Sequence, residues 1–223
     1  MLRQFLFLAL AFNLTFPLVA FSQSITDSKG TISQKVKQPS LTNNGDVSRI
    51  IPQISFLASN FTGDEFKFDT KMGFGAGVAA DIGTGSLVAE SGILYRQLGT
   101  QTNQYGQNLI LNLGYIGLPL LAKAYTNSNP HGFAAYFKGG VIPEILIYKE
   151  VSGNQPGGDF PVNSLDLEAA LGVGSKFPVN PNNDLFLEVT LNRGLTNVGA
   201  SSQGGSNVFN AALLLTAGLG IDL

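Results

Sequence analysis

Ser164–Phe177, SLDLEAALGVGSKF, is the stretch that decides the fold. From Leu165 to Phe177 its odd-numbered residues are apolar or small, whereas its even-numbered residues are Asp, Glu, Ala, Gly and Lys. Successive side chains of a strand point to opposite faces, so this alternation gives one apolar face and one face of charges and glycines. A helix would mix Asp166 with apolar residues on the same side. The stretch is therefore predicted to be a β-strand.

The same alternation recurs in seven further stretches. They are Ile50–Phe61, Gly73–Ile82, Leu87–Leu98, Asn108–Tyr125, Phe133–Tyr148, Leu185–Thr196 and Val208–Leu223. Most of the eight strands exceed the roughly 9–11 residues with which a tilted strand crosses a bilayer. In an outer-membrane barrel the apolar faces meet lipid, while charges and glycines fill a narrow interior. The sequence thus predicts an all-β, eight-stranded antiparallel up-and-down transmembrane β-barrel over residues 49–223.

The connections between these strands favour a membrane barrel over a soluble β-domain. Each odd-numbered connection is longer than its even-numbered neighbours. The odd-numbered ones are Thr62–Met72, Gly99–Gln107, Lys149–Asn163 and Asn197–Asn207, and the even-numbered ones are Gly83–Ser86, Thr126–Gly132 and Pro178–Asp184. Outer-membrane barrels have long loops outside and short turns in the periplasm, where an even strand number then places both termini. A soluble lipocalin-like carrier, whose apolar face points inward, is the alternative.

Residues 1–22, MLRQFLFLALAFNLTFPLVAFS, have the layout of an export signal. Arg3 supplies a positive start, Phe5–Phe21 is almost wholly apolar, and Ala20 and Ser22 are small residues that a signal peptidase accepts. We expect a cleaved signal peptide, Gln23 as the first mature residue, and the cell outer membrane as the destination. An uncleaved membrane anchor is the alternative. Residues 23–48, rich in Ser, Thr, Asn and Gln, are predicted to be a flexible periplasmic segment.

Composition excludes several classes of function. A net charge of −2, with no run of Lys or Arg, argues against a nucleic-acid partner. The chain has no cysteine, which removes thiol chemistry, and its one histidine, His131, is too few for a zinc site. His131 also falls in a predicted periplasmic turn, away from the outer leaflet where a barrel lipase needs it. Gly75–Ala80 matches G-x-G-x-x-A, but no helix pattern follows, so we interpret these glycines as facing the lumen. No catalytic, cofactor or metal site is predicted.

Nine charged residues share the interior phase of the predicted strands. They are Glu90, Arg96, Lys123, Lys138, Glu144, Asp166, Glu168, Lys176 and Glu188. Paired carboxylates can act as acid and base. Eight strands, however, enclose room for little besides side chains, and buried charges are tolerated when they are paired. We therefore expect a salt-bridge network that fills the lumen, with Asp81 and Asp222 near its periplasmic end.

Leu113–Tyr125, LGYIGLPLLAKAY, resembles the signature strand of the PorT-like outer-membrane β-barrel domain family. That strand commonly has a tyrosine, an aliphatic residue, a proline and a lysine that ends an apolar run, which here are Tyr115, Ile116, Pro119 and Lys123. The family often has an acidic residue where this chain has Gly117. Other similar pieces are Ser91–Tyr95 before Gly99, Asp166 with Gly172–Gly174, and Gly194–Asn197. The resemblance spans about Arg49–Leu223 and implies an eight-stranded barrel in the outer membrane of a Gram-negative bacterium; some relatives take part in protein secretion.

The predicted function is a structural or interaction role for a barrel with a side-chain-filled lumen, without enzymatic activity. Assistance to secretion or envelope assembly is one form of that role. The expected partners are outer-membrane lipid and an envelope or secretion protein that the extracellular loops contact, with Lys149–Asn163 as the longest loop. We expect a monomeric barrel. A small solute channel and a barrel enzyme acting on lipids are the alternatives.

Overall fold

A computed structural model describes residues 47–63, 69–104, 107–127, 132–153, 162–199 and 207–223. Residues 1–46, which carry the predicted signal peptide and almost all of the predicted N-terminal segment, lie outside the described residues, as does His131. Among the described residues no helix is long and apolar enough to cross a membrane.

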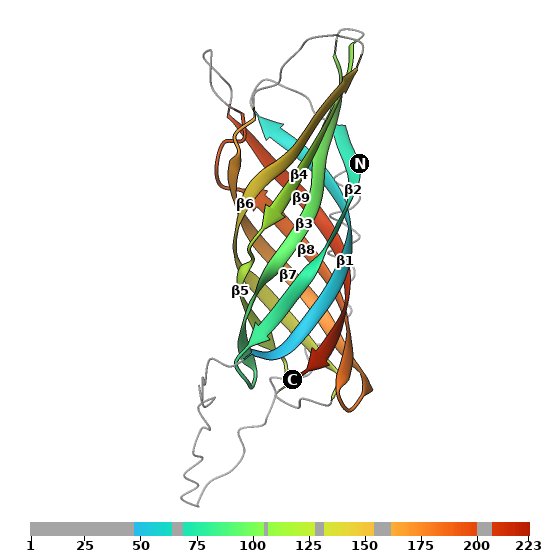
Figure 1. The fold of residues 1–223 in the computed structure, drawn as a ribbon, viewed down its shortest axis with the longest axis vertical. Helices are drawn as coiled ribbons and strands as arrows, with labels where there is room; N and C mark the ends of the chain where they lie inside the picture. Colours follow the sequence, from blue (N-terminus) through green and yellow to red (C-terminus); the bar gives the residue numbers. More distant parts are fainter. Residues whose placement is uncertain (1–46, 64–68, 105–106, 128–131, 154–161, 200–206) are drawn as a thin grey trace, which may run out of the picture. The chain divides into compact units, whose positions relative to one another are not determined.

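Antiparallel strands form one sheet that closes on itself (Figure 1). The strands of the described residues are β1 (Val47–Gly63), β2 (Asp69–Ile82), β3 (Leu87–Gln104), β4 (Gln107–Gly117), β5 (Leu120–Tyr125), β6 (Ala134–Gly153), β7 (Leu165–Asn180), β8 (Asn183–Gly194) and β9 (Val208–Asp222). β1 pairs with β2 on one side and with β9 on the other, which closes the ring and leaves no free edge. The predicted all-β up-and-down barrel is confirmed.

The fourth position of the ring holds two strands. β4 ends at Gly117 and β5 begins at Leu120, because Pro119 has no N–H to donate to a ladder. The amide of Leu118 donates to the carbonyl of Pro143 on β6, at 3.0 Å. β3 and β6 each pair first with β4 and then with β5. The ring therefore has eight positions, as expected, but the predicted strand Asn108–Tyr125 is interrupted.

The two ends of the barrel differ. We call the end that carries Val47, Leu223 and the connections after β2, β5 and β7 the terminal end, and the opposite end the loop end. The predicted strict alternation of connection lengths is wrong, because residues 105–106 alone separate β3 from β4 at the loop end, whereas residues 126–133 separate β5 from β6 at the terminal end.

The reason is that several polar stretches pair as strands. The ladder between β3 and β4 continues to Gln104 and Gln107, through most of the predicted connection Gly99–Gln107. β6 likewise continues to Gly153, so the beginning of the predicted loop Lys149–Asn163 is strand. Main-chain hydrogen bonds form without apolar side chains, so polarity alone does not mark a loop. β3, β4 and β6 reach beyond their neighbours at the loop end (Figure 1).

Apolar side chains cover the outside of the barrel. Phe56 on β1, Leu171 on β7 and Leu215 on β9 are between 57% and 69% exposed, whereas Asp166 and Glu168 on β7 are buried inside. The predicted phase of β7 is confirmed. A lipocalin-like carrier buries its apolar face, so this arrangement contradicts that alternative.

The interior near the loop end is apolar, which the sequence analysis did not foresee. Ten buried side chains form this apolar plug: Leu57, Phe61, Leu98, Leu111, Leu113, Tyr115, Val198, Val208, Ala212 and Leu214. Val198 follows β8 and is held there because its amide donates to the carbonyl of Val208, at 2.8 Å. Between this plug and the terminal end the interior contains charged side chains, together with smaller clusters of buried apolar and aromatic ones such as Ile51, Tyr136 and Phe186.

Candidate functional site

The nine charged residues of the predicted lumen network all lie buried in the interior, and none is more than 9% exposed. The structure does not bring them into one network. It divides them between two clusters at different heights, and it adds charged residues that the sequence analysis did not include.

The terminal-end cluster contains four cations and five carboxylates. Its members are Arg49, Asp81, Glu90, Lys123, Lys138, Lys176, Asp184, Glu188 and Asp222. Charges of opposite sign are therefore nearly balanced in this part of the interior. Paired in this way, the charges can be tolerated in a medium of low dielectric constant.

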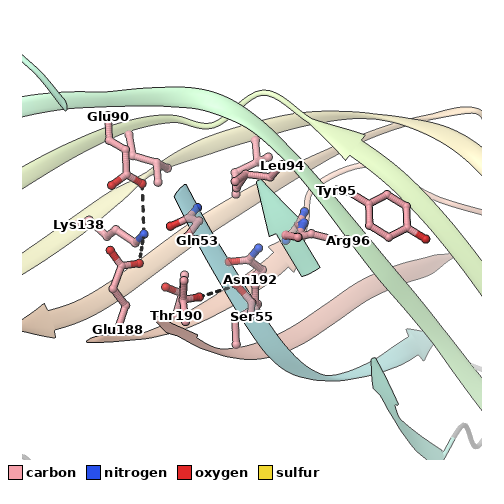
Figure 2. A pocket seen from close by; sticks show the side chains of 15 residues that line it. Gln53, Ser55, Glu90, Leu94, Tyr95, Arg96, Lys138, Glu188, Thr190 and Asn192 are labelled. Carbon is pink, nitrogen blue, oxygen red and sulfur yellow. Dashed lines mark hydrogen bonds and ion pairs between the residues drawn. The ribbon is translucent and has the colours of Figure 1, made fainter. Parts of the chain in front are cut away.

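Two lysines link the carboxylates in the middle of the barrel. Lys138 on β6 lies between Glu188 and Glu90 and contacts both (Figure 2); its Nζ is 3.2 Å from the oxygen of Glu90. Lys123 on β5 contacts the other oxygen of Glu90 and lies 2.8 Å from Asp81. The hydroxyl of Tyr136 donates to Glu188 at 2.6 Å. The result is a chain of alternating charges across the bore.

Arg49 on β1 holds the carboxylates nearest the terminal end. Its guanidinium lies 2.6 Å from Asp222 and 2.9 Å from Asp184. It also lies over the ring of Phe186, 5.5 Å from the centroid, which adds a cation–π contact. A Cβ atom at Gly220 would lie 2.6 Å from the Cδ of Arg49, so only glycine leaves room for this side chain.

The loop-end cluster consists of Arg96, Glu144, Asp166 and Glu168. Arg96 on β3 donates from Nε to Glu144 at 2.9 Å and from Nη2 to Glu168 at 2.8 Å. Asp166 accepts instead from neutral groups, namely the hydroxyl of Thr196 and the amide of Asn210, each at 2.5 Å. This cluster therefore contains three carboxylates and one guanidinium.

Strand register explains why the carboxylates meet. Glu144 on β6 lies directly opposite Asp166 on β7, and Glu168 follows Asp166 on the same face. Gly117 on β4 lies opposite Glu144 on its other side, and a Cβ atom there would be 2.6 Å from Oε1 of Glu144. The glycine at position 117 therefore makes room for the acidic side chain of the neighbouring strand.

A cavity of about 30 Å³ lies between the two clusters (Figure 2). Arg96 and Asn192 line it on one side, and Glu90, Lys138 and Glu188 line it on the other. This volume holds about two water molecules. Polar and apolar side chains both line the cavity, which has the size of a site for internal waters, not of a water column.

Sequence reasoning missed Arg49 and Asp184, although a signal was present for each. Asp184 shares its period-two phase with Phe186 and Glu188 on β8, but it had been placed in a connection. Arg49 lies one residue before the predicted first strand. Three carboxylates that could hold a metal ion were also not foreseen: Glu144, Asp166 and Glu168 each bring one oxygen to within 4.8 Å of the others.

Comparison with protein families matches residues 21–199 to a family described as outer membrane protein beta-barrel domain. Similar solved structures include Neisserial surface protein A, at 16% identity over 78% of this chain and 97% of that chain, with a TM-score of 0.49. They also include OprG from Pseudomonas aeruginosa, at 12% identity over 80% of this chain and 97% of that chain, with a TM-score of 0.49. No curated protein matches the chain.

Proposed function

Because the chain belongs to the outer membrane protein β-barrel domain family, we propose that it serves in the outer membrane as a non-conducting barrel with a structural or interaction role. The loop end would face outward, and the terminal end would face the periplasm. The observation that carries this proposal is the filling of the interior by the apolar plug and by two charge clusters.

The energetics of the interior favour a closed barrel over a channel. A conducting path requires that charged side chains leave their partners and that the apolar plug moves aside. Separating a buried pair such as Lys138 and Glu188 leaves an uncompensated charge, which costs on the order of 3–5 kcal/mol. The cavity of about 30 Å³ does not by itself join the two ends.

Recording from planar bilayers tests the proposal. The purified protein, shown to be inserted by its resistance to external protease, is expected to give no steady open level. A porin in the same bilayers is the positive control. A variant with Lys138, Glu90 and Glu188 all changed to Ala widens the bore and shows whether any current follows this route. Steady, ion-selective conductance of the unmodified barrel would contradict the proposal.

A role in protein secretion or envelope assembly is the finer part of the proposal. It is supported by the PorT-like segment Leu113–Tyr125 and by the extension of β3, β4 and β6 at the loop end (Figure 1), where Ile147 and Tyr148 are exposed. A strain that lacks the protein is expected to secrete less of an exported protein, or to assemble less of an envelope protein. Reintroduction of the intact gene should restore the normal amount. Unchanged exported and envelope proteins would contradict this role.

We also propose that the barrel is not an enzyme. Acyl chemistry in barrels generally requires a histidine beside a serine, and the single histidine, His131, falls in the sequence between β5 and β6. Incubation with phospholipid and lipopolysaccharide is expected to give no product, and a product that His131→Ala abolishes would contradict this.

A further inference from the structure

The loop-end cluster contains more negative charge than its own cation can balance. One guanidinium, that of Arg96, faces the carboxylates of Glu144, Asp166 and Glu168, and all four side chains are nearly or wholly buried. Like charges directly opposite in a ladder, as Glu144 and Asp166 are, destabilise a sheet. In the terminal-end cluster, by contrast, each carboxylate contacts at least one cation. The surplus of negative charge is thus confined to the loop-end cluster.

Unpartnered buried atoms gather at the same site. Within the described part of the chain, Oε2 of Glu144 and Oε1 of Glu168 are buried without a hydrogen-bond partner, as is the donor Nη1 of Arg96. The hydroxyl of Tyr115 is also buried, and no described group forms a well-aligned hydrogen bond with it. The side chain of Asn210 and the three carboxylates lie near this hydroxyl. Unpaired buried polar atoms are rare in folded proteins and call for an explanation such as a bound ion or water.

Asn192 supplies a further oxygen. Its amide nitrogen donates to Glu168 at 3.0 Å, and this hydrogen bond fixes which way the amide points. Its carbonyl oxygen is consequently left buried and without a partner. Asn192 and Arg96 both line the cavity of about 30 Å³, so this cavity reaches the edge of the cluster and has room for a water ligand.

From these observations we infer that the loop-end cluster binds one hard divalent cation, with calcium as the best fit. Carboxylate, amide and water oxygens are the ligands that calcium takes, in sets of six to eight and in flexible geometry. Magnesium demands a stricter octahedron, and the cluster offers neither the nitrogen nor the sulfur ligands of zinc. A divalent ion cancels the two negative charges that Arg96 leaves unbalanced. The binding of the ion does not rest on the proposed lack of conductance, whereas its slow exchange does.

The position of the site predicts slow exchange. The apolar plug lies on the loop side, and the terminal-end cluster closes the other side. The ion must therefore enter while the barrel folds, and it should stay bound when chelator is added afterwards.

The experiment is to refold the full chain from urea into detergent micelles with calcium, with magnesium or with a chelator. After desalting, elemental analysis measures the bound metal, and circular dichroism measures the unfolding midpoint. We expect one calcium per barrel, a higher midpoint than in chelator, and little metal loss when chelator is added after folding. Refolding in magnesium should give less bound metal than refolding in calcium, and a smaller increase in the unfolding midpoint.

Variants on the same strand provide the matched comparison. Glu144→Gln should bind no calcium and should be at least as stable in chelator as the unmodified chain, because it removes part of the charge surplus. Glu168→Gln provides a second variant with the same expected loss of calcium. Glu150→Gln, an exposed position also on β6, should bind calcium like the unmodified chain.

Three results would overturn the inference. The first is an unmodified chain that folds in calcium but retains none. The second is calcium retained equally by both Glu144→Gln and Glu168→Gln. The third is a stability that rises as the pH falls and is indifferent to calcium, which would show that protons and not a metal neutralise the surplus.

Discussion

Lys138→Met removes the central cation of the barrel and is expected to destabilise it strongly. In the folded protein the ammonium of Lys138 joins Glu188 on one side to Glu90 on the other. Removal of this ammonium does not affect the two carboxylates equally. Glu90 keeps its contact with Lys123, whereas Glu188 keeps, among the residues that the structure describes, only the hydrogen bond from Tyr136.

The magnitude follows from this asymmetry. Leaving one buried carboxylate without its cation costs about 3–5 kcal/mol. The hydrogen bond from Tyr136 to Glu188 persists, so we expect the lower part of that range, about 3 kcal/mol. At about 2–4 °C for each kcal/mol in a chain of this size, the unfolding midpoint should fall by about 6–12 °C.

Circular dichroism in detergent micelles is the suitable assay, because the chain has no tryptophan whose fluorescence could report unfolding. Lys149→Met is the matched control. It is the same substitution on the same strand, at an exposed position, where less than about 1 kcal/mol is expected. In the double variant Lys138→Met with Glu188→Gln, most of the lost stability should return, because the unpaired charge is gone.

Two outcomes would refute the reasoning. If Lys138→Met unfolds at the same temperature as Lys149→Met, the interior is wet enough to solvate Glu188, and the lumen is an aqueous path. If Glu188→Gln restores nothing, the cost arises from lost packing of the lysine side chain and not from charge.

Three further predictions concern other parts of the chain. Leu171→Arg should cost about 2–4 kcal/mol near the middle of the bilayer; rapid reaction of a cysteine at this position with a water-soluble maleimide in intact membranes would show that this face does not meet lipid. Gly117→Ala should cost about 1–3 kcal/mol by crowding Glu144, measured by the unfolding midpoint, whereas Gly139→Ala on the outer face should cost less; equal losses would contradict the crowding. N-terminal sequencing of protein from membranes should give Gln23 as the first residue, and an intact Met1 would exclude cleavage.

The face of each residue could be predicted from the sequence, because period-two alternation needs no knowledge of neighbouring strands. Asp166 and Leu171 show this clearly: on β7 the even-numbered Asp166 points inside and the odd-numbered Leu171 points outside. Height along the barrel could not be predicted. It depends on the stagger of strands that are far apart in the sequence, so nothing in the chain indicated that Glu144 meets Asp166 while Lys138 meets Glu188.

The apolar plug was missed for a different reason. Leu57, Leu98 and Leu113 all lie in the interior phase of their strands, and Leu98 is two residues from Arg96. The expectation that polar residues fill a barrel applies to the charges of the interior phase and does not predict that leucines of the same phase gather at one end. The strands extend further than predicted because polar residues, such as those before Gln104, pair with the neighbouring strand as well as apolar residues do.

The pairing of β1 with β9 has a consequence for how the protein forms. The two strands come from opposite ends of the described barrel, with Arg49 aligned to Asp222, 173 positions further along the chain. The last ladder therefore closes the longest loop in the fold, a contact of high sequence separation that slows folding. Until it closes, Arg49 lacks Asp222, and a charged inner surface beside two open strand edges is exposed at the membrane. Such an intermediate is prone to aggregate. The slow step in folding should thus be the meeting of the first and last strands of the described barrel.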